Sequence, residues 1–173
     1  MIFEINKAIE ILERTPSVLE TLLKDISKEW SHNNEGENTW SPYDILGHLI
    51  HGEKTDWVPR AKIILSNGPN KTFEPFDRFA QKKEDPTKTI SDKLDEFKKL
   101  RSENLKTLTS LKIDGTVLQK KGIHPELGEA SLKELLSTWV VHDLGHISQV
   151  TRVMAKQYKE EVGVWKAYLG ILK

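Results

Sequence analysis

Four stretches of the sequence repeat their apolar residues with the 3.6-residue period of an amphipathic α-helix, which favours an all-helical architecture. The stretches cover residues 2–30, 40–65, 89–111 and 131–158. Each apolar face needs a partner to bury it, so the pattern predicts an all-α four-helix bundle. The bundle is expected to form one domain, residues 1–173, closed by a short C-terminal helical tail. That tail carries Trp165, Tyr168 and Leu169 and is expected to pack on the bundle.

Prolines and loop compositions mark where these helices break. Thr15-Pro16 predicts a break near Arg14, with Thr15 as the N-cap of the restarted helix. Pro59 removes one helical hydrogen bond and predicts a kink in the second helix. Two long connections follow, Ser66 to Lys88 and Ile113 to Leu127, and no pair of strands is expected. Long connections in compact domains are often functional.

The charge balance argues against some classes of protein, and the absence of cysteine excludes several kinds of site. Lys plus Arg and Asp plus Glu number 26 each, so the formal net charge is zero. A nucleic-acid or anionic-membrane binder is expected to carry a basic excess, which this chain lacks. Without cysteine, disulfides, thiolate ligands and a cysteine nucleophile are impossible. The N-terminus lacks signal-peptide features, and no apolar run approaches the ~20 residues of a membrane span. We expect a cytoplasmic protein.

Two histidines, His142 and His146, lie four residues apart in the apolar segment VHDLGHISQV. This spacing places both on one face of a helix, where they can bind a metal ion or simply pack. The second helix adds His48 at the edge of its inward stripe, and a bundle can bring it opposite the pair. Three histidines with open positions left for water are typical of a catalytic metal site. His51 is an alternative or fourth ligand, although a surface position is favoured.

Several neighbours of these histidines have candidate roles. Glu53 is the best candidate for a general base, and a role in orienting a ligand histidine or in structure is given more weight. Asp143 points about 100° away from His142, so it is expected at the surface or paired with Arg60 or Arg152. Gln149 lies one turn beyond His146 and is expected to line the pocket or to bond a ligand histidine. Trp139 is expected in the core, and His32 and His124 at the surface.

Three segments of the chain resemble the DinB-like superfamily: WSPYDILGHL with Glu53 downstream, HDLGHISQ, and VGVWKAYL. Helix order, connection positions and total length also agree, so the resemblance covers most of the chain. The likeness is to the branch of YfiT-type proteins, which are regarded as metal-dependent hydrolases. One position departs from the family pattern, because residue 51 is histidine where the family more often has a small or acidic residue.

The resemblance implies a divalent metal ion held by His48, His142 and His146. Relatives are reported with nickel or zinc, some form dimers, and some are transferases or isomerases that use a low-molecular-weight thiol. The implied function is therefore a metal-dependent hydrolase or thiol transferase, with a small-molecule substrate or thiol as partner and a homodimer as the expected assembly.

Two functions without catalysis stay open beside this one. The metal ion could be structural or sensory, or the chain could be a helical interaction module whose histidines are satisfied by each other and by water. A serine hydrolase lacks support because there is no GxSxG motif. Nucleotide cofactors lack support because neither GxGxxG nor GxxxxGK[ST] occurs.

Overall fold

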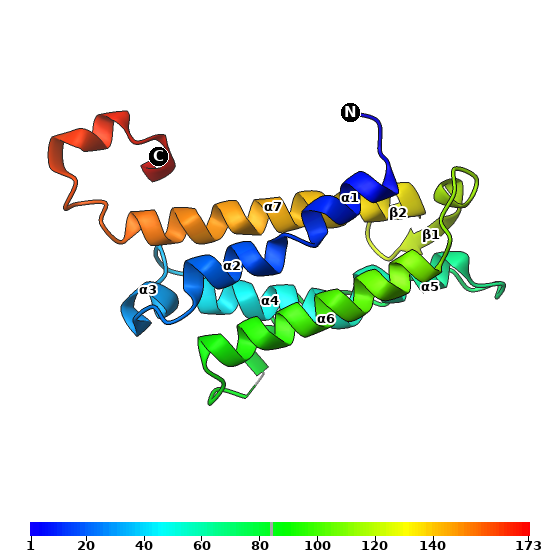
Figure 1. The fold of residues 1–173 in the computed structure, drawn as a ribbon, viewed down its shortest axis with the longest axis horizontal. Helices are drawn as coiled ribbons and strands as arrows, with labels where there is room; N and C mark the ends of the chain where they lie inside the picture. The colour runs from blue at the N-terminus through cyan, green and yellow to red at the C-terminus, as the bar shows by residue number, and fades with distance from the viewer. Residues whose placement is uncertain (84) are drawn as a thin grey trace.

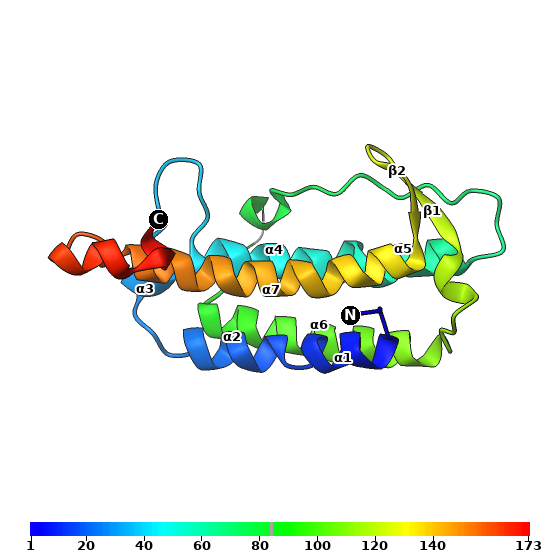
Figure 2. The same cartoon turned by 90° about the horizontal axis from the view of Figure 1, so that it is seen from above.

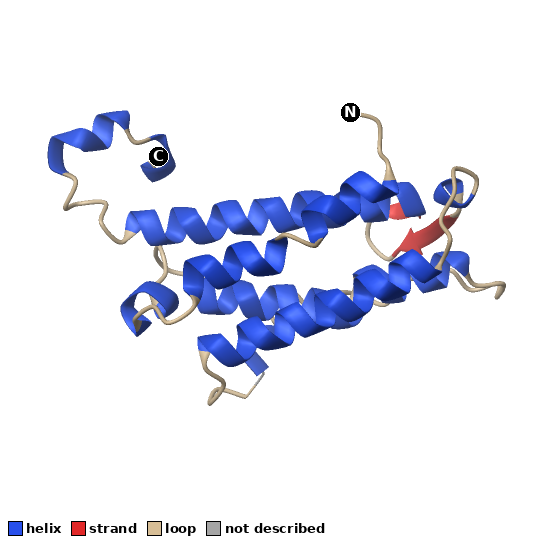
Figure 3. Ribbon diagram, viewed as in Figure 1, coloured by secondary structure: helices blue, strands red, loops and turns tan. Residues whose placement is uncertain are grey.

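The computed structural model describes residues 1–83 and 85–173, and its helices form the expected bundle (Figure 1, Figure 3). The α-helices are α1 (Ile5–Leu12), α2 (Thr15–Leu23), α3 (Lys28–His32), α4 (Pro42–Thr55), α5 (Trp57–Leu65), α6 (Ile90–Ser110) and α7 (Leu132–Lys156). Short 3-10 turns are η1 (Ala80–Lys83), η2 (Val117–Gln119), η3 (Gly163–Tyr168) and η4 (Gly170–Leu172). The strands are β1 (Lys121–His124) and β2 (Gly128–Ser131). The all-α four-helix bundle is confirmed, with one added hairpin.

The four positions of the bundle are filled by α1 with α2, by α4 with α5, by α6, and by α7. They lie in two layers, α4, α5 and α7 in one and α1, α2 and α6 in the other (Figure 2). The pair α1 and α2 contacts both α6 and α7, and so does the pair α4 and α5. This order places α4 beside α7, so the histidines of the second and fourth predicted helices come together.

Capping boxes begin three of the long helices. The hydroxyl oxygens of Ser41, Thr89 and Ser131 each accept a hydrogen bond from the main-chain N–H three residues later. The acidic side chain at that later position accepts in return from the N-cap N–H, so two unpaired donors are satisfied at each start. Thr15 is not a cap, contrary to the prediction. It is the first residue of α2, after Arg14 as the N-cap, and its hydroxyl donates to the Ile11 carbonyl at 3.3 Å.

Two predicted helices are interrupted where the backbone departs from regular helical angles. The second divides at Asp56, between α4 and α5, three residues before the predicted kink at Pro59. The reason is steric, because a proline ring clashes with the carbonyl four residues earlier, here that of Thr55. The first predicted helix stops at Leu23, because Asp25 adopts a left-handed φ of 58°.

The prediction that no strands pair is wrong. Strands β1 and β2 form an antiparallel hairpin, and its turn ends at Gly128, whose φ of 79° favours glycine. The hairpin anchors the long connection after α5, since Phe73 N–H donates to the Ile123 carbonyl at 2.9 Å. A Cβ at Gly122 would lie 2.4 Å from the Phe73 ring, so this close approach requires glycine. The predicted connection also includes Glu84, which lies outside the described residues.

The apolar core consists of two clusters at the two ends of the bundle. One includes Leu12, Trp57 and Trp139, and the other includes Phe97 and Val153. No helix in residues 1–83 or 85–173 is both long and apolar enough to cross a membrane.

The C-terminal tail packs on the bundle, as predicted. Trp165 and Tyr168 are 68% and 83% exposed, so these two rings lie largely in solvent. Leu172 in η4 is the buried residue of the tail, and η4 contacts α7.

Candidate metal centre

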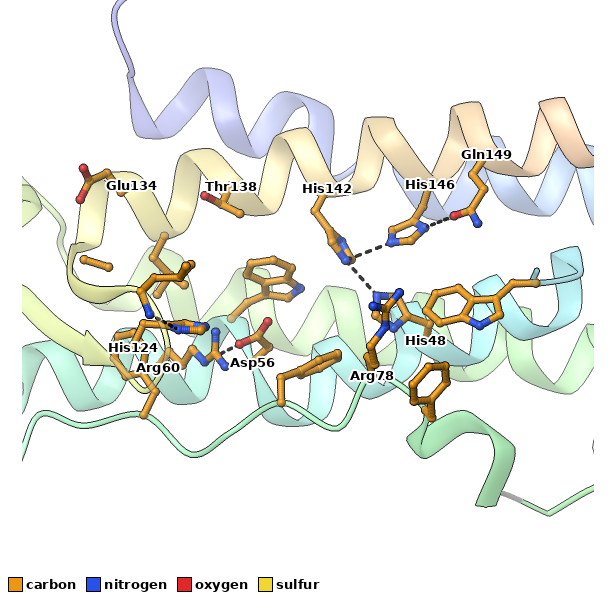
Figure 4. Close-up of a pocket in the computed structure, with 18 of the residues that line it drawn as sticks. His48, Asp56, Arg60, Arg78, His124, Glu134, Thr138, His142, His146 and Gln149 are labelled. Carbon is orange, nitrogen blue, oxygen red and sulfur yellow. Dashed lines mark hydrogen bonds and ion pairs between the residues drawn. The ribbon is translucent and has the colours of Figure 1, made fainter. Parts of the chain in front are cut away.

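Three imidazole rings converge where α4 lies beside α7 (Figure 4). The Nε2 atom of His142 lies 3.1 Å from Nε2 of His48 and 3.1 Å from Nε2 of His146. The four-residue spacing stacks His142 and His146 on one face of α7, and helix packing supplies His48 from across the interface. One ligand atom from each of the three rings lies within 4.8 Å of the others, so the structure brings together the three predicted ligands.

The two separations that involve His142 Nε2 fit a shared cation better than two simultaneous hydrogen bonds. An imidazole Nε2 has either one N–H or one lone pair, so His142 Nε2 is able to bond only one of its two neighbours. At metal–nitrogen distances of 2.0–2.1 Å, two ligand nitrogens lie about 2.9 Å apart at a right angle and about 3.3 Å apart at the tetrahedral angle. The two observed separations of 3.1 Å fall between these limits. The donor set suits zinc, nickel, copper or iron.

Burial keeps these imidazoles neutral near pH 7. Burial, with a smaller contribution from the repulsion of neighbouring positive charges, lowers the pKa of both His48 and His142 to about 3. Burial also lowers the pKa of His146, against a hydrogen bond to Gln149 that raises it. A neutral imidazole has the free lone pair that a metal ion requires.

Gln149 orients one of the three rings. Its Oε1 accepts a hydrogen bond from Nδ1 of His146 at 2.8 Å, as expected from its position one turn along the helix. Because Nδ1 then holds the proton, Nε2 keeps its lone pair toward the other two histidines. The Nδ1 atoms of His48 and His142 are buried and have no hydrogen-bond partner among the described residues. The rings of these two histidines are held by aromatic packing, His48 against Trp40 at 4.8 Å and His142 against Trp57 at 5.0 Å between centroids.

The three histidines line a cavity of about 760 Å³. Aromatic side chains form part of its wall, including Trp40, Phe76 and Phe79. Arg60 and His124 lie toward the opposite end of the cavity in Figure 4. A pocket of this size holds a small molecule with the histidine cluster on its wall.

His124 does not lie where the sequence predicts, whereas His51 does. His124, expected at the surface, is half-buried and lines the cavity. Its Nδ1 accepts from the main-chain N–H groups of Glu126 and Leu127 at 3.2 Å, so the ring N–H is at Nε2. The sequence does not predict this location of His124, because it does not predict the hairpin that positions the residue. His51 lies outside the three-histidine cluster, as expected, with its ring 4.9 Å from that of Phe76.

A buried ion network lies in the bundle interior. Arg101 on α6 is 1% exposed, and Glu53 and Asp143 are 2% and 0% exposed. The guanidinium donates to Glu53 Oε1 at 2.8 and 3.1 Å, and to the two Asp143 oxygens at 2.6 and 3.0 Å. A fifth bond, 2.7 Å long, goes to the Leu12 carbonyl, which is free because Pro16 has no N–H to donate. All five N–H groups of Arg101 are therefore satisfied.

The network includes Asp143 and Glu53, for which the sequence suggests other locations or roles. Asp143 is not at the surface and does not pair with Arg60 or Arg152, because it faces inward to Arg101. Glu53 Oε2 accepts from Asn104 at 2.9 Å, so both carboxylate oxygens are engaged. Burial raises the pKa of Glu53, and Arg101 opposes this shift. Glu53 does not line the cavity, a location that favours the predicted structural role over a role as general base.

Comparison with known protein families assigns the chain to one of them. The family model described as the DinB superfamily matches residues 11–150, a span that includes all three clustered histidines. The chain belongs to the DinB superfamily. No curated protein sequence matches it.

Two solved structures support the DinB superfamily fold. The first is YfiT from Bacillus subtilis, described as a probable metal-dependent hydrolase with an unusual four-helix bundle topology. It superposes with a TM-score of 0.73 at 17% identity, over 94% of this chain and 91% of YfiT. The second is TT2238, described as a four-helix bundle protein, with a TM-score of 0.56 at 18% identity over 84% of this chain and 97% of that one. At these identities the likeness shows the fold alone.

The buried histidines predict a pH dependence for the metal-free form of this DinB superfamily protein. The pKa of His48 and His142 is about 3 in the folded state and 6.5 without burial. Between these values the unfolded chain binds more protons, so the free energy of unfolding should decrease as the pH falls from 6.5. Thermal melts of chelator-treated protein between pH 7 and 5 measure this decrease. A variant with both histidines replaced by leucine should show a smaller slope, and an equal slope would contradict the assignment.

Proposed function

We propose that the protein binds a divalent transition-metal ion, zinc or nickel, through His48, His142 and His146, and acts as a metal-dependent hydrolase or low-molecular-weight-thiol transferase. The observation that carries this proposal is the convergence of three neutral imidazoles on the wall of a cavity of about 760 Å³. A structural ion is usually enclosed by four protein ligands, whereas three ligands beside a cavity leave room for a substrate. When bound, the ion supplies Lewis acidity that lowers the pKa of a coordinated water or thiol.

The surrounding residues have distinct tasks in this proposal. Gln149 fixes the orientation of His146 through its 2.8 Å hydrogen bond. Trp40 and Phe76 pack against His48, with ring centroids 4.8 and 5.4 Å away, and limit the access of bulk water to the cluster. Glu53 and Arg101 stabilise the interior that supports α4 and α7. The partner is a small-molecule substrate or thiol, and the homodimer implied by the family resemblance stays a prediction that light scattering tests.

The test is an assay of matched metal-loaded, chelated and reconstituted protein. Two reactions are followed, hydrolysis of p-nitrophenyl acetate and transfer of cysteine to an electrophilic acceptor. We expect activity in one of them to disappear on chelation, to return with zinc or nickel, and to be absent from the His146→Ala variant. His51→Ala is the matched control and should retain activity, because His51 lies outside the cluster. Activity unaffected by chelation and equal in both variants would overturn the proposal.

A further inference from the structure

The long connection after α5 supplies much of the cavity wall beside the histidine cluster. It runs back along the bundle on the side of α4, α5 and α7 (Figure 2). Phe73, Phe76, Arg78 and Phe79 of this connection all line the cavity. The Phe76 ring meets the His48 ring edge-on, with 5.4 Å between centroids. A segment that contacts a ligand histidine and also lines the cavity is in position to select the substrate.

Arg78 differs from the other two arginines of the cavity in its charge balance. Arg60 is neutralised by Asp56, with Nε 2.5 Å from the carboxylate. Arg152 is neutralised by Glu35, also at 2.5 Å. Within residues 1–83 and 85–173, no carboxylate lies within ion-pair distance of Arg78. It therefore presents an uncompensated positive charge at the cavity.

Aromatic rings hold the Arg78 guanidinium in place. Its central carbon lies 5.2 Å from the centroid of the Phe79 ring and 5.8 Å from that of Trp40. Trp40 in turn contacts His48, with 4.8 Å between ring centroids. Packing on ring faces orients the planar guanidinium and leaves its N–H groups available for another acceptor. The Arg78 side chain lies beside His48, next to the histidine cluster (Figure 4).

We propose that Arg78 determines specificity by binding an anionic oxygen group of the substrate, a carboxylate or a phosphoryl group, an inference that rests on the proposed function. The apolar or aromatic body of the substrate packs against Trp40 and Phe76, and its reactive bond lies at the three histidines. Arginine suits this task because its rigid fork donates two parallel hydrogen bonds to a carboxylate or phosphoryl group. The aromatic wall suits a flat substrate body, because ring pairs are favoured in offset or edge-on arrangements.

Calorimetric titration with simple aromatic ligands tests this inference. Benzoate has the proposed anion, benzamide is its neutral counterpart of nearly the same shape, and phenylphosphonate has a phosphoryl group instead. The wild-type protein should bind at least one of the two anions more tightly than benzamide, and the preferred anion identifies the group. Arg78→Gln should weaken that anion at least about tenfold, as for a lost charge-assisted hydrogen bond, and should leave benzamide affinity unchanged.

Lys82→Gln is the matched control, because it removes one positive charge from the same connection. Lys82 also lies over the Phe79 ring, at 5.4 Å, but it does not line the cavity. Its anion affinity should equal that of the wild-type protein. Two results would overturn the inference: anion binding by Arg78→Gln that matches the wild type, or an equal loss of anion affinity in Lys82→Gln. Equal metal contents and melting midpoints of the three proteins ensure that the comparison is valid.

Repeating the titrations on chelated protein separates this inference from the proposed function. The charge of Arg78 does not depend on a bound metal ion, so its contribution to anion affinity should persist in the chelated protein. Arg78-dependent anion binding by a protein with no metal-dependent activity would leave the inference standing and reject the proposed function. Metal-dependent activity without any effect of Arg78→Gln on anion affinity would support the proposed function and reject the inference about Arg78.

Discussion

Replacing Arg101 with methionine should lower the free energy of unfolding by about 3–5 kcal/mol, the range measured when one partner of a buried ion pair is removed. The guanidinium makes hydrogen bonds to Glu53, Asp143 and the Leu12 carbonyl, and all three residues are buried. Without it, two buried carboxylates face each other with no cation between them. Urea unfolding of the wild-type and Arg101→Met proteins measures the difference.

Lys98→Met is the matched control, since Lys98 lies on the same helix and pairs with Glu20 at 2.8 Å on the exposed surface. Exposed pairs contribute little to stability, so the unfolding midpoint of this variant should stay close to that of the wild type. Combining Arg101→Met with Glu53→Gln and Asp143→Asn should recover part of the loss, because the uncompensated charges are then removed. An Arg101→Met protein as stable as the Lys98→Met protein would contradict the buried network.

Replacing His142 with alanine should weaken zinc binding by more than about 100-fold. Changes to groups that only orient a ligand already cost about 10–100-fold, and loss of a ligand should cost more. His142 is the central member, because its Nε2 lies 3.1 Å from the Nε2 atoms of both His48 and His146. Competition with a coloured zinc chelator gives the affinity of each protein.

His51→Ala is the control for this measurement and should bind zinc as the wild type does. The melting midpoint of each metal-free variant shows whether the bundle remains folded, which the two apolar clusters should ensure. A His142→Ala protein with wild-type zinc affinity, or an equal loss in His51→Ala, would show that the ion is held elsewhere.

Local sequence is sufficient to predict the parts of the fold that depend on local physics. The helices follow from apolar periodicity, and the starts at Ser41 and Ser131 follow from capping residues at fixed spacing. The pair His142 and His146 follows from the four-residue spacing on one helix. Placing His48 opposite them required only that the two inward faces meet, as they do in the structure.

The parts that were not predicted depend on contacts between distant segments. Arg101 lies 48 residues from Glu53 and 42 from Asp143, so no spacing in the sequence links them. One signal was present, because Arg101 occupies an inward position between Phe97 and Leu105 where an apolar residue is expected. A charged residue on a buried stripe requires an interior partner.

The hairpin could not be predicted from the sequence for a different reason. Its strands are four residues each, too short for a clear alternating pattern, and it packs against the distant connection through Phe73. Because the hairpin positions His124, the cavity role of that residue was also missed.

The most direct test of the metal centre is the metal content of protein purified without a histidine tag or chelator, measured by inductively coupled plasma mass spectrometry. The three-histidine site predicts about one equivalent of zinc or nickel per chain, and little metal in a variant with His48, His142 and His146 all replaced by alanine. A wild-type protein that contains no transition metal, and takes up none on titration, would contradict the account and leave the three imidazoles as packing residues between α4 and α7.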